Sequence, residues 1–388
     1  MLSLKLILHH LLLHFVFIFQ LVHSLTHPSD IIALKAFKSF INPTTIPSYS
    51  CLASWDFSFD PCSLPRKTHF ICGLTCNFDS TRVTSLVLDP VGYSASLSPL
   101  LSTLTELTHL DFSDNSFYGS IPSSFSSLTK LETLTLRFNS LSGPIPFSLT
   151  KLTYLQILDI SHNALTGSLP NTLNSLTNLR TLDLSYNKIN SFLPKLPPNL
   201  VELALKSNAL TGSLAQSSFH ELTQLVVVEL SDNLLSGVLQ DWFFLLPSLQ
   251  QVDLANNSFT RVDVSKPSSS NSNLVAVDLG FNKIDGYLPV NFAMFPTLAS
   301  LSFRYNKFQG PIPWHYGNKA SLRRLFLDGN FLNGKVPAGF FSKSGELSGS
   351  LGNNCLENCP VSSELCLPSQ KPGSICNQIY GKRPNSKP

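Results

Sequence analysis

The sequence has 388 residues, of which 13% are charged, and a formal net charge of +3. This near balance, without a dense run of Lys or Arg, gives no support for nucleic-acid binding. The eight cysteines are an even number, which favours disulfides if the chain is exported to an oxidising compartment.

Residues 1–24 have the layout of a secretory signal peptide. Lys5 gives a positive start, residues 6–22 are mostly apolar, and Ser24 is a small residue at the expected cleavage point. An uncleaved membrane anchor is the alternative, which the short apolar run, interrupted by three histidines, disfavours. No other stretch reaches the ~18 apolar residues that span a bilayer. We therefore expect a protein secreted to the extracellular space or cell wall.

Residues 25–82 are expected to form an N-terminal cap. Ser29 and Asp30 can cap a helix, and residues 42–43 (Asn-Pro) end it. The apolar stripe of this helix has members three or four residues apart: Ile31, Leu34, Phe37 and Ile41.

Residues 83–345 repeat the phrase L-x-x-L-x-L-x-x-N about eleven times, as in Leu155, Leu158, Ile160 and Asn163. Ten asparagines recur at a step close to 24 residues: Asn115, Asn139, Asn163, Asn187, Asn208, Asn233, Asn257, Asn282, Asn306 and Asn330. Such a period and phrase are typical of the leucine-rich repeat, and they predict a solenoid. In L-x-L, alternation along the strand turns both apolar residues inward, so each coil adds one strand to a parallel sheet.

The repeated asparagines are expected to form a structural ladder and not a ligand site. An inward amide is costly unless it is bonded, and each bond to the backbone of a neighbouring coil contributes about 1 kcal/mol. The first coil has Val91 in place of the asparagine, and a last half-coil ends near Leu351 and Asn354. Terminal repeats of a solenoid are expected to be atypical.

After the asparagine, several coils add L-x-G-x-I-P, as at residues 119–122, 143–146 and 310–313. With these motifs the chain resembles plant extracellular leucine-rich-repeat proteins, of the receptor-like type without a kinase domain. The resemblance covers roughly residues 29–380. It implies an α/β horseshoe: a plant-type solenoid with a parallel concave β-sheet and disulfide-stapled N- and C-terminal caps.

The resemblance extends to the N-terminal cap through Trp55, the Asp-Pro-Cys motif that ends at Cys62, and Cys76. It implies a Cys62–Cys76 bridge, and we pair the remaining Cys51 with Cys72. Residues 346–388 are expected to form a C-terminal cap and polar tail. Its cysteines allow three pairings, which the sequence leaves open: Cys355, Cys359, Cys366 and Cys376. Zinc binding by these cysteines is disfavoured, since no histidine lies nearby, and we expect no metal site.

Four coils in the middle depart from the repeat, and two of them, at residues 212–215 and 237–240, lack only the proline. Residues 190–194 lack the glycine, and that coil is three residues short. Residues 261–264 lack both the glycine and the proline, and a serine-rich stretch, 266–273, follows as a surface loop. We expect the convex side to be less regular there.

The concave face offers the candidate binding residues, which lie next to the ladder and are aromatic or basic: Arg137, Phe138, His162, Tyr186, Phe281, Arg304 and Tyr305. The alternative is that the aromatics pack against neighbouring coils. A column of mid-strand acids either recognises a basic partner or, as we favour, is a solvated feature of the repeat. One sequon makes Asn256 a glycosylation candidate.

No catalytic constellation and no cofactor motif is evident. The resemblance implies a secreted, non-enzymatic recognition protein in signalling, defence or development, which binds a protein or peptide ligand or a receptor kinase at the cell surface. The alternative is a polygalacturonase-inhibitor-like protein that blocks a wall-degrading enzyme, which the acid column disfavours. The Arg-x-Arg pair that peptide-hormone receptors of this family often use is absent.

Overall fold

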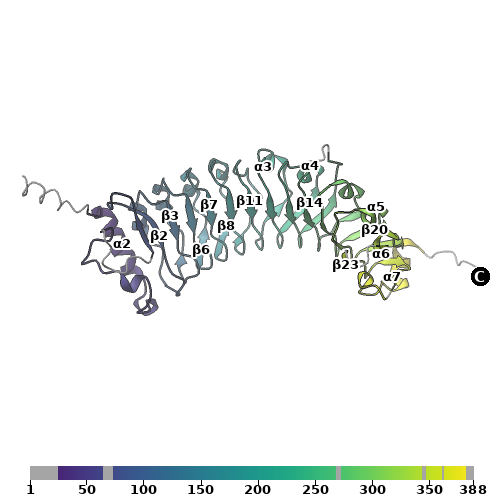
Figure 1. Ribbon diagram of the computed structural model, residues 1–388, viewed down its shortest axis with the longest axis horizontal. Coiled ribbons are helices and arrows are strands. Elements are labelled where there is room, and N and C mark those ends of the chain that lie inside the picture. The colour runs from purple at the N-terminus through teal and green to yellow at the C-terminus, as the bar shows by residue number, and fades with distance from the viewer. Residues whose placement is uncertain (1–24, 64–72, 268–271, 343–346, 361, 382–388) are drawn as a thin grey trace, which may run out of the picture. The chain divides into compact units, whose positions relative to one another are not determined.

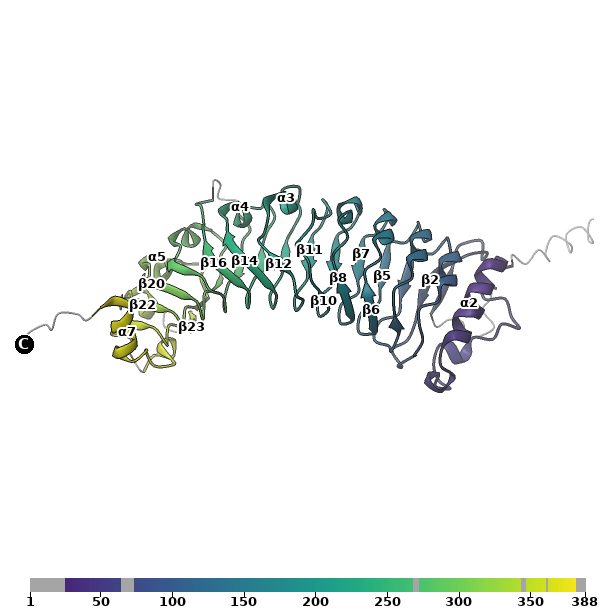
Figure 2. The ribbon, with the colours of Figure 1, turned by 180° about the vertical axis from the view of Figure 1, so that it is seen from behind.

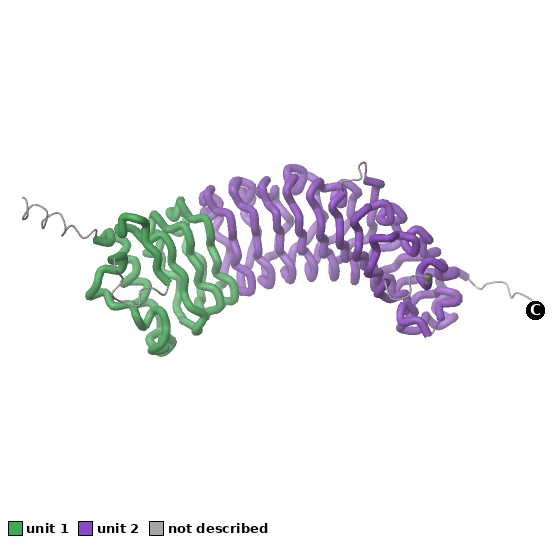
Figure 3. The backbone as a smooth tube through the Cα atoms, viewed as in Figure 1, with its two compact units in different colours: residues 1–141 green, residues 142–388 purple. Residues whose placement is uncertain are grey.

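The structure is a computed structural model that describes residues 25–63, 73–267, 272–342, 347–360 and 362–381. It forms two compact units, residues 1–141 and 142–388 (Figure 3). The expected signal peptide and Cys72, with its proposed bridge to Cys51, lie outside the described residues.

Unit 1 begins with helix α2 (Pro28–Phe40), followed by the 3₁₀ turns η1 (Pro43–Thr45) and η2 (Leu52–Ser54). The expectation that Ser29 or Asp30 caps this helix is wrong: His27 is the N-cap, and its Nδ1 accepts from the N–H of Ser29. The ring of Phe37 stacks 4.9 Å from that of Phe112, so the helix packs on the first coils.

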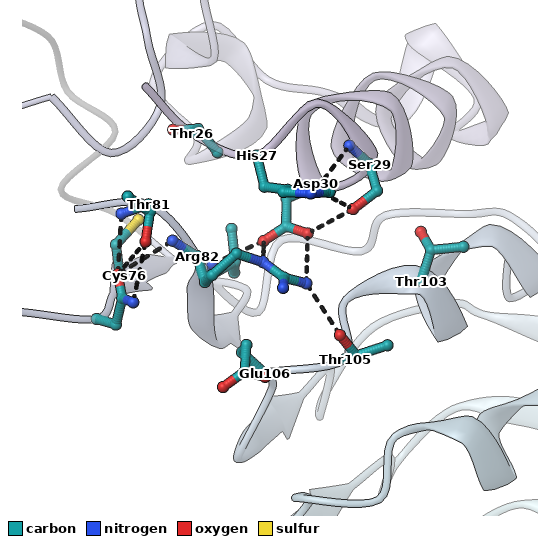
Figure 4. A network of polar contacts seen from close by, with 12 residues as sticks. Thr26, His27, Ser29, Asp30, Cys76, Thr81, Arg82, Thr103, Thr105 and Glu106 are labelled. Carbon is teal, nitrogen blue, oxygen red and sulfur yellow. Dashed lines mark hydrogen bonds and ion pairs between the residues drawn. The ribbon is translucent and has the colours of Figure 1, made fainter. Parts of the chain in front are cut away.

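Asp30 is instead the centre of a buried ion pair (Figure 4). Arg82 donates to its carboxylate through Nε and Nη2, both at 3.1 Å, and the N–H of Val83 donates at 2.9 Å. Arg82 Nη2 also donates to Thr105 Oγ1 at 3.0 Å. These donors offset the cost of burying the Asp30 carboxylate. The ion pair and hydrogen bonds attach α2 to the first strand of the repeats.

The sheet of unit 1 starts with an antiparallel pair, β1 (Leu74–Cys76) and β2 (Val83–Val87). The strands β3 (His109–Asp111) and β5 (Thr133–Thr135) then continue from β2 in parallel. The remaining elements of these coils are η3 (Pro99–Thr103), β4 (Tyr118–Gly119), η4 (Ser123–Ser127) and β6 (Ser140–Pro144), and β6 contains the division between the units. A disulfide joins Cys62 to Cys76, the pair that the resemblance implied.

Unit 2 carries nine parallel strands in chain order within its described residues (Figure 1). They are β7 (Ile157–Asp159), β9 (Thr181–Asp183), β11 (Glu202–Ala204), β13 (Val227–Glu229), β15 (Gln251–Asp253), β17 (Ala276–Asp278), β19 (Ser300–Ser302), β21 (Arg324–Phe326) and β23 (Ser348–Ser350). The middle residue of most of them, such as Leu182 or Leu301, is fully buried. The flanking residues therefore face outward, as the L-x-L pattern predicted.

A second layer of short strands in unit 2 is interrupted at two places. Its strands are β8 (Ala164–Gly167), β10 (Lys188–Ile189), β12 (Thr211–Gly212), β14 (Leu234–Leu239), β16 (Ser258–Val262), β18 (Asp285–Tyr287), β20 (Lys307–Pro311), β22 (Phe331–Lys335) and β24 (Cys355–Glu357). Figure 2 shows β8, β10, β12, β14 and β16 of this layer. Among described residues, pairing stops between β10 and β12 and again between β16 and β18. These are the short coil and the coil without the glycine and proline, whereas β12, β14 and β16 stay paired across the two coils that lack only the proline.

Short helical turns complete the coils of unit 2: η5 (Phe147–Lys151), η6 (Leu173–Ser175), α3 (Gln216–Phe219), α4 (Asp241–Phe244), η7 (Val290–Met294), α5 (Trp314–Asn318) and α6 (Gly339–Ser342). Their apolar side chains meet those of the strands in one core. The ring of Phe292 lies 5.1 Å from that of Phe244 and 5.7 Å from that of Phe303. The Phe244–Phe292 contact joins coils two repeats apart, since among the described residues the coil between them has no helical turn.

The C-terminal end of unit 2 has the 3₁₀ turn η8 (Glu364–Cys366) and helix α7 (Gly373–Tyr380). Two disulfides select one of the three pairings that the sequence left open: Cys355–Cys376 and Cys359–Cys366. The hydroxyl of Tyr380 donates to the carbonyl of Phe331 and accepts from the N–H of Gly310, which docks α7 on β20 and β22. Within the described residues, no helix is both long and apolar enough to cross a membrane.

Candidate functional site

The ladder asparagines belong to the framework of the coils. Asn330 is fully buried, and its Oδ1 accepts from the N–H of Phe308 at 3.0 Å. Its Nδ2 donates to the carbonyls of Phe303 at 2.9 Å and Leu327 at 3.0 Å. Asn354 repeats this pattern and extends the ladder into the half-coil. These amides are already used by the chain, so they are not ligand groups.

The residue before each ladder asparagine has a left-handed backbone. Where it is not glycine, its φ lies between +50° and +57°. The aromatic residues at this position stack on one another: the rings of His162 and Tyr186 lie 4.1 Å apart, and those of Phe281 and Tyr305 lie 4.8 Å apart. Phe281 and Tyr305 are still 47% and 42% exposed. Packing against the neighbouring coil therefore explains these rings, although Phe281 and Tyr305 stay nearly half exposed.

The two aromatic pairs do not form one continuous surface. The corresponding positions between them are Ser207, Asp232 and Asn256. Asn256 Nδ2 donates to Asp232 Oδ1 at 2.7 Å, and its side chain is exposed. Glycosylation of Asn256 remains a prediction.

Two of the sequence candidates, Arg137 and Phe138, belong to unit 1. Arg137 Nε lies 3.9 Å from Asp114 Oδ2, and both side chains are about half exposed. Phe138 is 44% exposed. The other five candidates lie in unit 2.

Arg304 is the most strongly held of the candidates. Its Nη2 donates to Asp328 Oδ2 at 3.2 Å, and Asp328 is 2% exposed. Its guanidinium carbon lies 5.0 Å from the ring centre of Phe326 and 6.0 Å from those of Phe281 and Tyr305. A side chain at Gly280 would collide with it, since a Cβ there would come 2.9 Å from Arg304 Cγ. Ion pairing and cation–π contact thus fix the guanidinium.

The mid-strand acids have a structural role that the sequence analysis missed. In Asp111, Asp159, Asp253 and Asp278, Oδ1 accepts from the backbone N–H two residues further on, at 2.8–3.1 Å. This bond shapes the turn after the strand. These four acids are half-buried, and Glu229 of the same column is exposed. The sequence contains a signal for this role, because in each of these coils the acid stands two residues before the residue whose N–H it accepts from.

The outward face of β13–β21 contains a cavity of about 410 Å³, which we name the β13–β21 pocket. Its outward-facing lining comes from five strands: Val227, Glu229, Gln251, Asp253, Ala276, Asp278, Ser300, Ser302, Arg324 and Phe326. The pocket exists because Ala276, Ser300 and Ser302 are small where neighbouring coils carry larger side chains. Its acids, Glu229, Asp253 and Asp278, belong to the mid-strand column for which recognition of a basic partner was the less favoured alternative, and no lining residue was among the selected binding candidates.

The acids on this face repel one another. Burial raises the pKa of Asp278, and the neighbouring Asp253 carboxylate adds to this, while Arg304 acts in the opposite direction. Burial also raises the pKa of Glu202 on β11, with further contributions from Asp183 and Glu229. A cation that binds to this surface would reduce the repulsion between its carboxylates.

This arrangement is suited to binding. In the described part of the chain, no group of three or more His, Cys, Asp or Glu side chains is placed to hold a metal ion. The acids of the pocket recur at the same position of successive strands, with Glu229 exposed and Asp253 and Asp278 half-buried.

The sequence comparison decides the family. The leucine-rich repeat region family matches residues 77–341. The chain is a leucine-rich repeat protein. Receptor-like protein 7 of Arabidopsis thaliana is 35% identical to it over 145 residues, which are 36% of this chain and 14% of that protein. The leucine-rich repeat protein thus spans far less than two thirds of the length of such relatives.

Solved structures share the fold of this leucine-rich repeat protein. The crystal structure of PEPR1-AtPEP1 is 29% identical with a TM-score of 0.70, covering 85% of this chain and 48% of the other. The ectodomain of the receptor kinase GASSHO1/SCHENGEN3 from Arabidopsis thaliana, in complex with CASPARIAN STRIP INTEGRITY FACTOR 2, is 27% identical with a TM-score of 0.65, covering 84% and 44%. A plant ice-binding protein, 24% identical with a TM-score of 0.57, covers 88% and 99% and shares the fold alone.

The chain is therefore a plant leucine-rich repeat protein related to receptor-like proteins and to the ectodomains of leucine-rich repeat receptors. Its fold is of the extracellular type with disulfides at both ends, and such ectodomain folds are typically non-catalytic.

Proposed function

We propose that this protein is a secreted, non-catalytic recognition module of the extracellular space or cell wall, which binds a peptide or protein ligand in the β13–β21 pocket. The observation that supports this proposal is the pocket itself. It is the place on the outward face of unit 2 where small side chains leave a cavity of about 410 Å³ beside fixed charges. Concave sites with a few positioned polar groups are the usual binding sites of proteins.

Arg304, Phe281 and Tyr305 contribute to the same region. Arg304 lies over the ring of Phe326, which lines the pocket, and it also acts on the Asp278 carboxylate. His162 and Tyr186 stack in the coils of β7 and β9, outside the lining. Exposed aromatics and arginine are the residue types enriched at binding hot spots. Among similar structures, GASSHO1/SCHENGEN3 holds a named partner on a fold of this kind, which supports a peptide or protein ligand here.

Filling the pocket tests this function. Ser300→Trp places a large side chain on its floor, whereas Thr181→Trp changes the same strand position on β9, outside the lining. Ligands captured from plant extracellular fluid and cross-linked to the protein are identified by mass spectrometry. We expect Ser300→Trp to lose the cross-linked peptides and Thr181→Trp to retain them. Equal capture by both variants, with unchanged thermal unfolding, would place the ligand elsewhere.

A further inference from the structure

The β13–β21 pocket has two chemically different walls. On one side, Glu229, Asp253 and Asp278 come from β13, β15 and β17. On the other side, Arg324 and Phe326 come from β21. The small residues between them carry no charge, so the walls are separated along the direction that crosses the strands.

In the part of the chain that the structure describes, no charged side chain pairs directly with either wall, although Arg304 acts on the Asp278 carboxylate from nearby. Asp253 accepts from the hydroxyl of Ser231 and the N–H of Ala255, and Asp278 accepts from the N–H of Gly280, all of which are uncharged donors. Within the described residues, neither these two acids nor Glu229 or Arg324 forms an ion pair. The exposed guanidinium of Arg324 and the acid wall are therefore available to a ligand of opposite charge.

We propose that the pocket binds an extended peptide segment in which a basic side chain and a carboxylate lie about four residues apart, the basic group on the acid wall and the carboxylate on Arg324. The proposal rests on the proposed function and names its ligand chemistry. From β15 to β21 there are three strand steps, roughly 14 Å at the usual strand spacing. An extended chain covers this distance in about four residues.

The residues around the two walls determine which residue types fit in the rest of the peptide segment. Phe326 is half-buried beside Arg324, and Ala276 and the two serines leave a shallow floor. Residues between the two charged groups are therefore expected to be small or apolar. The carboxylate is supplied by an Asp or Glu side chain or by a free chain end, since both present the same two oxygens to a guanidinium.

Labelled synthetic peptides test the spacing. An end-blocked peptide containing Lys-Ser-Ala-Ser-Glu is compared by fluorescence anisotropy with the same peptide carrying Gln for Glu, with one carrying Gln for Lys, and with one in which Lys and Glu are two residues apart. We expect each change to weaken binding about tenfold or more, because each removes one charge pair. A second arm ends the peptide in a free carboxylate in place of Glu, which separates the two carboxylate sources.

Matched variants of the full chain test which wall of the pocket binds each charged group of the peptide. Asp253→Asn with Asp278→Asn should weaken only peptides that carry Lys, and Arg324→Gln should weaken only those that carry the carboxylate. Arg324→Glu should restore binding to a peptide containing Lys-Ser-Ala-Ser-Lys. Asp183→Asn, a like change on β9 outside the pocket, is the control. Equal affinities for all peptides, or variants that act alike on all of them, would overturn the charge pairing.

Selection from a random peptide library displayed on phage separates this inference from the proposed function. Enriched peptides that carry the charge pair and fail to bind Ser300→Trp support both. Enriched peptides that depend on the pocket and lack the charge pair overturn the inference and leave the function standing. If no enriched peptide depends on the pocket, both fail.

Discussion

At the scale of single residues, the left-handed position before each ladder asparagine shows how backbone and surface are linked. A non-glycine residue with positive φ costs on the order of 1 kcal/mol. Ring stacking such as that of Phe281 on Tyr305, at 4.8 Å, returns about as much. The balance explains why aromatics are tolerated there without a ligand, so exposure alone does not make them a binding site.

The ladder can be tested at Asn330. Replacing it by leucine leaves the N–H of Phe308 and two carbonyls without their side-chain partner in a fully buried place. We expect Asn330→Leu to lower the free energy of unfolding by about 3 kcal/mol. The control Asn178→Ala, at an exposed asparagine, should cost no more than about 0.5 kcal/mol. Denaturant unfolding measures both, and similar values would refute the ladder's contribution.

The raised pKa of Asp278 makes stability depend on pH. The folded state holds the proton more tightly than the unfolded state, whose pKa is about 3.9. The stabilising contribution is therefore complete below the unfolded pKa and is lost as pH rises through the folded pKa. Asp278→Asn removes this loss while keeping an acceptor for Gly280. In urea unfolding, we expect the variant to gain stability relative to the wild type as pH rises above about 4, and a difference that does not change with pH would contradict this.

At the scale of secondary-structure elements, most coils have nearly the same structure. They differ mainly where the strands of the second layer do not pair. The second layer breaks at the coil of residues 190–194 and again before β18. At the second break, a cavity of about 500 Å³ opens between β16 and β18, lined by residues of both that include Arg261 and Tyr287. The main sheet continues past both breaks within unit 2, since its strands are held by separate bonds.

The attachment of α2 to β2 depends on one ion pair. Asp30→Asn leaves the partly buried Arg82 without its counter-charge, and we expect a loss of about 3–5 kcal/mol in the free energy of unfolding. The exposed pair Glu106–Lys130 gives a control, because Glu106→Gln should cost less than about 1 kcal/mol. Chemical denaturation followed by near-ultraviolet signals of the cap tests this. A loss at Asp30 no larger than that at Glu106 would show that the pair is not needed.

At the scale of the whole molecule, each coil contacts coils that are close to it along the chain, so damage at one end should stay local. The Cys355–Cys376 disulfide closes a loop with a sequence separation of 21 residues, and removing such a bridge costs about 3 kcal/mol. We expect Cys355→Ser with Cys376→Ser to speed amide hydrogen exchange in β22 and β24 and to leave β8 and β10 unchanged. Faster exchange in all four strands would mean that the coils of unit 2 open together.

The sequence by itself determined the repeat, the inward leucines, the asparagine ladder and the disulfide-bonded ends. Each of these is a short pattern repeated at fixed spacing, and local geometry translates it directly into coils. It also implied the Cys62–Cys76 bridge, through the resemblance of the cap.

Only the tertiary structure decided the pairing of the C-terminal cysteines, the role of Asp30 and the location of the β13–β21 pocket. The pocket depends on Glu229 at one wall and Phe326 at the other, which lie nearly one hundred residues apart. No residue of its lining is unusual within its own repeat. The cavity arises because small side chains from adjacent strands coincide in space, and that depends on the stacking of coils.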